Sequence, residues 1–218
     1  YSSAASDVYK RQVLAVKSVL VDLNDAAATL PNSYNSVENI TPLETPLSST
    51  INGAALATPV FLSLYAENDL RLDKYFAETD EKGFRKNKKA GSNNYLCTFR
   101  VGEIYLTAAE AAARLGELSQ ARTRLLELMR KRYAPEAYEA KSVVVNAMDK
   151  EALVQEILDE RARELAFEGH RWFDLRRSTR PRLEKVLDGT RYVLEENDAR
   201  YTLAIPKEAI EANPGLLN

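Results

Sequence analysis

The chain has 218 residues, of which 45% are hydrophobic and 28% are charged, and its formal net charge is −2. This length suffices for one sizeable hydrophobic core or two small ones, and the near-neutral charge gives no reason to expect nucleic acid as a partner. With one cysteine, Cys97, and one histidine, the sequence excludes an internal disulfide, and we expect no metal site of the usual His/Cys kind.

The first residues give little structural signal. The sequence begins at Tyr1 without an initiator methionine or a signal peptide, and residues 1–12 show no clear periodicity. We therefore expect residues 1–12 to be a non-native or disordered leader. Residues 13–218 are then expected to form a single domain that is incomplete at its N-terminus. No apolar run approaches the about 20 residues that a membrane-spanning helix needs.

Two segments of different character follow. Residues 13–30 carry apolar side chains at heptad spacing, which predicts a helix that ends before Pro31. Residues 31–59 are rich in Ser, Thr, Asn and Pro, which predicts a long irregular loop. Tyr34 and the asparagines beside it would suit a polar ligand, although a surface connection without a function is the simpler interpretation.

The next stretch returns to a helical pattern. Over residues 58–78, apolar side chains recur at helical spacing, with Thr58 as a plausible N-cap and Pro59 in the first turn. Residues 81–94 are rich in lysine and contain glycine, and we predict a solvated turn there.

Residues 97–131 predict a helical hairpin. Small and apolar residues repeat at helical spacing as far as Gly116, which suits the left-handed conformation that stops a helix. A second helix is predicted to begin near Ser119. Gly116 followed five residues later by Ala121 is the close-contact pair of a tetratricopeptide hairpin. Because the sequence contains one good copy of this repeat, it predicts the hairpin but not a full solenoid.

The C-terminal half is predicted to contain a central helix. We interpret residues 133–148 as a connection, because it holds a proline and a β-prone run of valines. Asp149 is a good N-cap for a helix that runs to Gly169, breaks or kinks there, and resumes through Arg176.

A small β-hairpin is predicted near the end of the chain. Residues 191–195 and 200–205 each carry β-branched and aromatic side chains, and four residues with turn character join them. The sequence thus predicts a mainly α fold with a tetratricopeptide-like helical hairpin core, long irregular loops and a small C-terminal β-hairpin.

Residues 160–177, ERARELAFEGHRWFDLRR, combine many charges with large apolar residues. Glu160, Glu164 and Glu168 recur every four residues and therefore share one face of a helix. Three like charges repel one another, so they require cations, and the planar fork of arginine binds carboxylates bidentately and tolerates burial. We predict a half-buried ion network that locks this helix to a neighbour. A solvated helix face with salt bridges is the alternative interpretation.

Catalysis by these carboxylates is not expected. They share one helix face, where the two-carboxylate geometry of glycoside hydrolysis is hard to build. Neighbouring cations would lower their pKa values, which is the wrong direction for a general acid. No Ser–His–Asp or Cys–His arrangement can be assigned, and we expect His170 to have a packing role. The sequence therefore favours a protein that is not an enzyme.

Four ordered blocks between residues 61 and 218 resemble the SusD/RagB family. They are N-D-x-R at 68–71, RVGEIYLTAAEA at 100–111, ELAFEGHRWFDLRR at 164–177, and Ile-Pro followed by Asn-Pro at 205–214. By this resemblance, the residues of the structural signature are Arg100, Glu103, Glu110, Arg161, Glu164, Glu168, His170, Arg171, Trp172 and Asp174. Arg100 and Glu103 are then the natural partners of the glutamate-rich helix.

The resemblance implies that the chain is the C-terminal portion of a nutrient-binding lipoprotein at the surface of the outer membrane, with its lipid anchor outside this chain. It implies non-catalytic capture of a glycan or another oligomeric nutrient, without a cofactor, for a SusC-like TonB-dependent transporter. Exposed aromatic faces would bind sugars, and the 11 tyrosines supply candidates, whereas Trp172 is expected to lie in the core. No single residue can be assigned to ligand binding. The alternative is a tetratricopeptide-like scaffold that binds protein segments.

Overall fold

The computed structural model describes residues 3–31, 33, 35–43, 56–89, 97–187, 189–213 and 215. The chain forms two compact units, residues 1–170 and residues 171–218. The helices of the first unit are α1 (Ser3–Val16), α3 (Pro59–Leu62), α4 (Arg71–Tyr75), α5 (Val101–Leu115), α6 (Leu118–Met129), α7 (Pro135–Ala147) and α8 (Lys150–Glu164). Its strands are β1 (Asn39–Leu43), β2 (Leu56–Ala57), β3 (Phe76–Thr79), β4 (Arg85–Asn87) and β5 (Cys97–Arg100).

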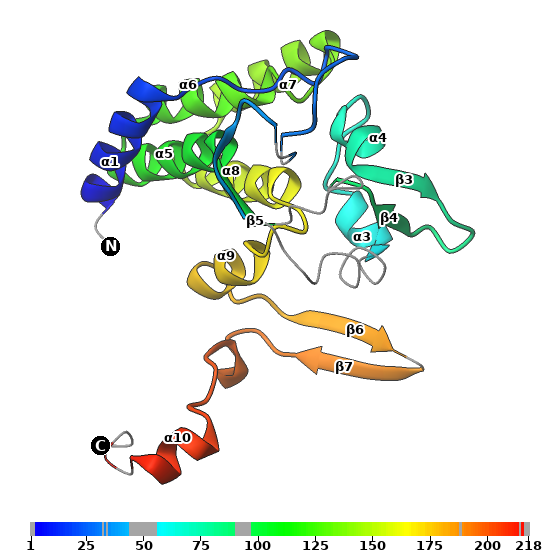
Figure 1. Cartoon of the computed structure of the whole chain (residues 1–218), viewed down its shortest axis with the longest axis vertical. Helices are drawn as coiled ribbons and strands as arrows, with labels where there is room; N and C mark the ends of the chain where they lie inside the picture. The colour runs from blue at the N-terminus through cyan, green and yellow to red at the C-terminus, as the bar shows by residue number, and fades with distance from the viewer. Residues whose placement is uncertain are drawn as a thin grey trace. The chain divides into compact units, whose positions relative to one another are not determined.

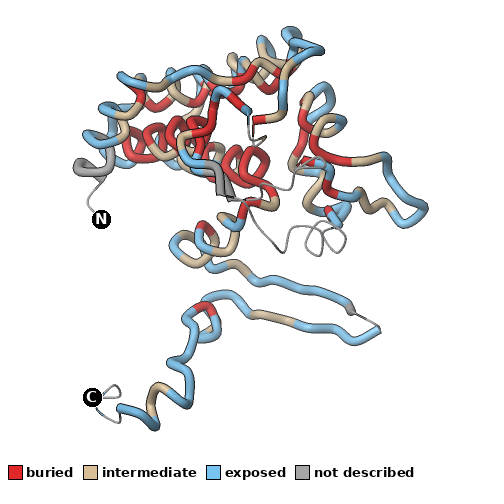
Figure 2. The backbone as a smooth tube through the Cα atoms, viewed as in Figure 1, coloured by how far each residue is buried: buried red, intermediate tan, exposed pale blue. Residues whose placement is uncertain are grey.

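Helix α5 is the centre of the first unit. It contacts α1, α6 and α8, and almost all of its residues are buried (Figures 1 and 2). The reason lies in its composition, because a row of alanines allows neighbouring helices to approach closely from several sides. Larger residues from those neighbours, among them Leu125, Leu128 and Ile157, then fill the core around it.

The hairpin of α5 and α6 has the predicted geometry. Gly116 follows α5 with φ +85°, the left-handed conformation that ends a helix, and its N–H donates to carbonyls of the last turn. Ala121 on α6 is fully buried, as expected for a close contact between the two helices. The fold is therefore mainly α and tetratricopeptide-like, as the sequence predicted.

The helix predicted over residues 13–30 is confirmed only as far as Val16 and is wrong beyond it. Helix α1 covers Ser3–Val16, and the chain then runs without helix beside α6 and α7 (Figure 1). The acidic side chains after α1 explain the difference, because Asp22 and Asp25 accept hydrogen bonds from backbone N–H groups two residues further on. Such local turns compete with the helix. Residues 3–12 are helical here, and a non-native origin for residues 1–12 stays a prediction.

The long helix predicted over residues 58–78 is also wrong. Thr58 is the N-cap and Pro59 the first residue, as predicted, but α3 is a single turn. The chain reverses at Asn68, whose φ of +63° does not fit a helix, before α4 begins. Strands β2, β4 and β3 then form a three-stranded antiparallel sheet, and strands β1 and β5 form an antiparallel pair.

Residues 135–147 form helix α7, so the predicted connection is wrong there. Pro135 occupies the first helical position, where its fixed φ favours a helix, and Val145 is fully buried. Tertiary packing thus outweighs the β preference of valine. For α8, Asp149 is the predicted N-cap, and its carboxylate accepts the Ala152 N–H at 2.9 Å. Helix α8 ends at Glu164, earlier than predicted.

The second unit contains α9 (Arg171–Arg177), β6 (Leu183–Leu187), β7 (Thr190–Leu194), the 3-10 helix η1 (Ala199–Tyr201) and α10 (Lys207–Ala212). A β-hairpin exists as predicted, but β7 pairs with the preceding β6 instead of residues 200–205. Gly189, with φ +75°, lies in the turn between the two strands, and its left-handed conformation explains why the chain reverses there. Among the described helices, none has the length and hydropathy that would let it cross a membrane.

Candidate functional site

The three regularly spaced glutamates lie inside the first unit. Glu160 and Glu164 belong to α8, and both are fully buried, while Glu168 is 6% exposed. Glu168 lies between Phe167 and Gly169, which both have positive φ, so the helical spacing does not extend to it. The carboxylates nevertheless join one network, which is buried and not half-buried as the sequence predicted.

Glu164 is the centre of the network. Arg132 binds it bidentately, with Nε 2.9 Å from Oε2 and Nη2 2.9 Å from Oε1. Arg100 Nη1 lies 2.6 Å from Oε1, and Arg71 Nη1 lies 3.1 Å from Oε2. Three guanidinium groups from distant parts of the sequence therefore surround one carboxylate.

Arg100, at the end of β5, binds both Glu164 and Glu168, which confirms the pairing expected for this arginine. Its Nε and Nη2 bind the two oxygens of Glu168 at 3.0 and 2.9 Å. Its Nη1 also lies 3.1 Å from Glu38 Oε2. Glu38 in turn accepts from Arg132 Nη2 at 2.6 Å, so this glutamate of the long N-terminal connection closes the ring around Glu164.

Arg71 extends the network towards the start of α4. Its Nε and Nη2 bind the two carboxylate oxygens of Asp69 at 2.9 and 2.8 Å, and its Nη1 lies 2.7 Å from Glu160 Oε1. Its guanidinium also lies over the ring of Tyr133, 5.2 Å from the centroid. Arg163 completes this side by donating to Glu160 Oε2 at 2.8 Å. The charges are thus enclosed by hydrogen bonds and aromatic faces.

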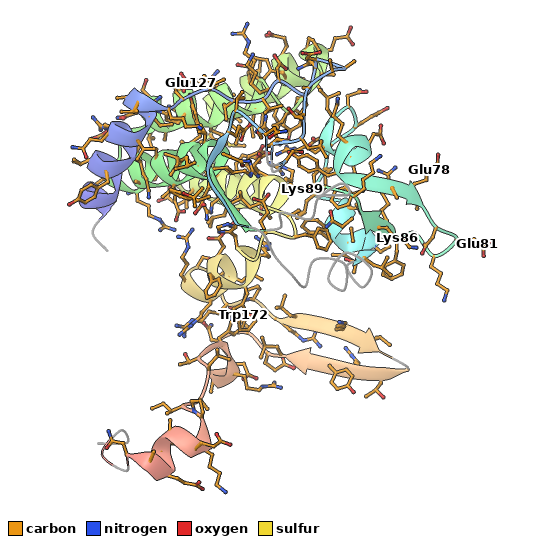
Figure 3. All side chains as sticks on the ribbon, in the orientation of Figure 1. Glu78, Glu81, Lys86, Lys89, Glu127 and Trp172 are labelled. Atoms are coloured by element: carbon orange, nitrogen blue, oxygen red, sulfur yellow. The ribbon has the colours of Figure 1, made fainter. Side chains whose placement is uncertain are left out.

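The solvated turn predicted over residues 81–94 is confirmed at residues 81–82, which are exposed, and is wrong at Lys89, while residues 90–94 lie outside the described residues. Lys89 is 1% exposed, and its ammonium binds the Glu168 carboxylate and the Glu164 carbonyl (Figure 3). The ammonium also lies 4.5 Å from the centroid of the Tyr75 ring. Burial lowers the pKa of Lys89 to about 8, although Glu168 favours its protonated form.

The network balances its charges. Among the described residues, its buried carboxylates and cations are equal in number: Glu38, Asp69, Glu160, Glu164 and Glu168 with Arg71, Lys89, Arg100, Arg132 and Arg163. At its edge, Arg163 also binds Glu156, which pairs with Lys141 in turn. Burial alone would raise the pKa of Glu160, but Arg71 and Arg163 outweigh it and hold that pKa at about 2. Burial would also raise the pKa values of Glu164 and Glu168, but neighbouring arginines outweigh the effect of burial, so both pKa values are lowered. Glu160, Glu164 and Glu168 are therefore ionised and enclosed, and none of the three is available to a substrate as an acid.

The other signature residues lie elsewhere. Glu103 was expected to join the glutamate-rich helix, but its Oε2 lies 3.9 Å from His170 Nε2, and both side chains are partly exposed. Glu110 pairs with Arg114 along α5, and Arg161 donates to Thr107 at 3.1 Å.

In the second unit, Arg171 begins α9 and Asp174 pairs with Arg177. Trp172 stacks on Tyr201 with ring centroids 5.2 Å apart and is partly buried, short of the core position expected for it. Figure 3 labels Trp172 beside α9. The signature thus brings only Arg100, Glu164 and Glu168 of its members into the described network.

Sequence reasoning missed the basic and acidic members that lie in loops. Glu38, Lys89 and Arg132 stand in stretches without periodicity or at a helix end, where a charged residue predicts a solvated surface. It also missed Gly102, which occupies the space beside the network. A Cβ at this position would lie 2.5 Å from Arg100 Nη1. The available signal was a glycine near the start of a helix, where it has a low helix propensity.

A groove opens on the surface of the first unit, and it is a candidate binding site. It has a volume of about 380 Å³ and is lined by Asp22, Asn24, Arg130, Lys131, Pro135, Tyr138 and Glu139. These residues come from the connection after α1, the end of α6 and the start of α7. Tyr34, a candidate from the sequence, lies outside the described residues. Among the residues that the structure describes, no group of three or more His, Cys, Asp or Glu side chains is arranged to hold a metal ion.

Comparisons with known proteins agree with the fold. The SusD family model matches residues 56–218. A SusD-like carbohydrate binding protein from Bacteroides vulgatus is 17% identical with a TM-score of 0.67, covering 95% of this chain and 54% of its own. A SusD superfamily protein from Bacteroides thetaiotaomicron is 19% identical with a TM-score of 0.67, and the match covers 97% of this chain and 59% of that protein.

A third solved structure is less extensive in its match. It is a SusD superfamily protein from Bacteroides fragilis, 24% identical with a TM-score of 0.53, covering 71% of this chain and 36% of its own. The chain thus spans little more than half the length of the first two solved structures. No curated protein matches it.

Proposed function

Because the chain belongs to the SusD family, we propose that it captures a glycan or another oligomeric nutrient without altering it chemically. In this proposal it acts as a lipoprotein at the surface of the outer membrane and delivers its ligand to a SusC-like TonB-dependent transporter. The observation that carries the proposal is the family match over residues 56–218.

The chemistry of the chain supports capture over catalysis. The glutamates that a glycoside hydrolase would need are fully engaged by arginines inside the protein. A general acid requires a raised pKa, and here the arginines lower the pKa values of Glu160, Glu164 and Glu168 against the effect of burial. One of the solved relatives is described as a carbohydrate binding protein, which supports a glycan as the ligand class.

A tetratricopeptide-like scaffold for protein segments is the second candidate. The α5–α6 hairpin favours it, since such hairpins present grooves to peptides in repeat proteins. In this chain, however, α1, α6 and α8 all pack against α5, and most of α5 is buried. The central helix of the hairpin therefore has little surface left for a peptide.

A binding survey with product analysis tests the proposal. The purified chain is applied to a panel of neutral and charged oligosaccharides and to a peptide library, and bound ligands are confirmed by calorimetry. We expect saturable binding of at least one oligosaccharide, with the sugar recovered intact. Binding of peptides alone would favour the scaffold, and shortened sugar products would establish an enzyme.

A further inference from the structure

The surface groove has the dimensions and composition of a small-ligand site. Its volume of about 380 Å³ falls within the range of ligand pockets, roughly 300–1,000 Å³. Three segments build it: the connection after α1 supplies Asp22 and Asn24, the end of α6 supplies Arg130 and Lys131, and the start of α7 supplies the rest. Polar groups from separate parts of the chain therefore converge on one space.

Part of the groove is fixed before any ligand arrives. Lys131 Nζ lies 2.8 Å from Asp22 Oδ2, and Asn24 Nδ2 donates to Asp22 Oδ1 at 3.0 Å. The same amide nitrogen lies 3.2 Å from the Tyr133 carbonyl, and the Leu23 N–H donates to the Lys131 carbonyl at 2.9 Å. These contacts hold side chains in place, which reduces the entropy that binding would cost.

The buried ion network also fixes the backbone beside Asp22, on one side of the groove. Arg132 donates to the carbonyl of Val21, and the N–H of Val21 donates to Glu38 Oε1 at 2.9 Å. Asp22 follows Val21 directly in the chain. Arg132 and Glu38 are therefore positioning residues for the groove, because they fix the backbone that carries its polar wall.

Other lining groups are left available. Arg130 and Glu139 are exposed, and Tyr138 is partly buried because it packs against the hydrophobic core. Across the described part of the chain, no hydrogen bond or ion pair occupies the guanidinium of Arg130, the carboxylate of Glu139 or the hydroxyl of Tyr138. The groove thus combines one aromatic ring with unused donors and acceptors.

We propose that this groove binds a unit of a neutral oligosaccharide. Two cations, Arg130 and Lys131, balance two carboxylates, Asp22 and Glu139, so the lining has no net charge to attract an ionic ligand. Neighbouring hydroxyl groups of a sugar both donate and accept, as this lining requires, and the apolar face of a sugar suits the Tyr138 ring. The inference rests on the proposed function and assigns a site to it.

Substitutions on opposite sides of the groove test this assignment. We expect Arg130→Ala and Tyr138→Ala each to weaken binding of a neutral oligosaccharide by about tenfold or more, the loss of one well-formed contact. Arg130→Ala is expected to leave the melting temperature unchanged, because this side chain is exposed. Arg130→Ala can therefore decide the test even if Tyr138→Ala fails to fold. Arg124→Ala, on the same helix outside the groove, and Tyr192→Ala, on the hairpin, are matched controls that should bind normally.

The outcomes separate the inference from the function. If the chain binds neutral oligosaccharides and both groove variants bind as tightly as the parent, the site lies elsewhere and only the inference is overturned. Binding of charged sugars alone overturns the inference in the same way. If the chain binds no sugar at all, the inference fails together with the glycan form of the proposed function.

Discussion

Gly102 shows how tightly the ion network restricts a single position. It is the second residue of α5, and a Cβ there would also lie 3.1 Å from Glu164 Oε1 and 3.1 Å from Glu38 Oε2. Arg100 cannot move aside easily, because Glu168 holds its guanidinium at two further points. The absence of a side chain at Gly102 is therefore a condition for the close packing of these charges.

We expect Gly102→Ala to destabilise the protein by about 1–3 kcal/mol, the usual cost of forcing extra volume into a packed interior. Helix propensity alone predicts the opposite sign, because alanine stabilises a helix by roughly 0.5–1 kcal/mol relative to glycine. Urea denaturation of both proteins measures the difference. A variant as stable as the parent, or more stable, would show that the ion network can accommodate a methyl group at this position.

At the scale of elements, the network joins helix α8 to segments that the sequence alone did not connect. The glutamate spacing and the N-cap at Asp149 were sufficient to predict the helix and its need for cations. Arg100 could be assigned through its motif. The remaining partners depend on tertiary proximity, since Lys89 and Glu38 come from turns with no periodic pattern.

The same limit explains the wrong element boundaries. Asp22 and Asp25 form local turns where heptad spacing predicted a helix, and the buried Val145 stabilises a helix where valines predicted none. A hydrophobic pattern gives the face that is buried, but it does not include the contacts that decide between competing local structures. The groove was not predictable either, because its lining comes from three separated segments.

Replacing the central carboxylate tests how firmly α8 is held. We expect Glu164→Gln to destabilise the protein by about 3–5 kcal/mol, because it leaves buried guanidinium groups without a full complement of negative charge. The matched control is Glu127→Gln, since Glu127 is 43% exposed and pairs only at the surface with Arg124. That change should cost less than about 1 kcal/mol. Equal urea midpoints for the two variants would contradict a structural role for the network.

For the whole molecule, the network predicts sensitivity to acid. The pKa of Glu160 is about 2 in the folded protein against 4.5 for an ordinary glutamate, and the pKa values of Glu164 and Glu168 are lowered as well. Because the folded-state values are depressed, the stabilisation is complete above about pH 4.5 and is lost as the pH falls towards 2.

Thermal unfolding followed by circular dichroism measures this dependence. We expect the melting temperature to fall steeply between pH 4.5 and pH 2. These limits are the pKa of Glu160 in the unfolded chain and its pKa of about 2 in the folded protein. The change in melting temperature per pH unit should be smaller in Glu164→Gln, because this variant has already lost one of the three carboxylates. A melting temperature that stays constant down to pH 2.5 would refute the pH dependence expected from the lowered pKa values of these glutamates.

The distances along the chain between network partners also bear on how the protein is made. Glu38 and Arg132 are 94 residues apart, and Glu168 is translated later still. While the ribosome is producing the intervening residues, Glu38 lacks its partner Arg132, and Arg100 lacks its partners Glu164 and Glu168. A nascent chain that stops before Glu168 therefore leaves Arg100 and Lys89 without one of their carboxylate partners, and the interior that encloses them is completed only after Glu168 is made.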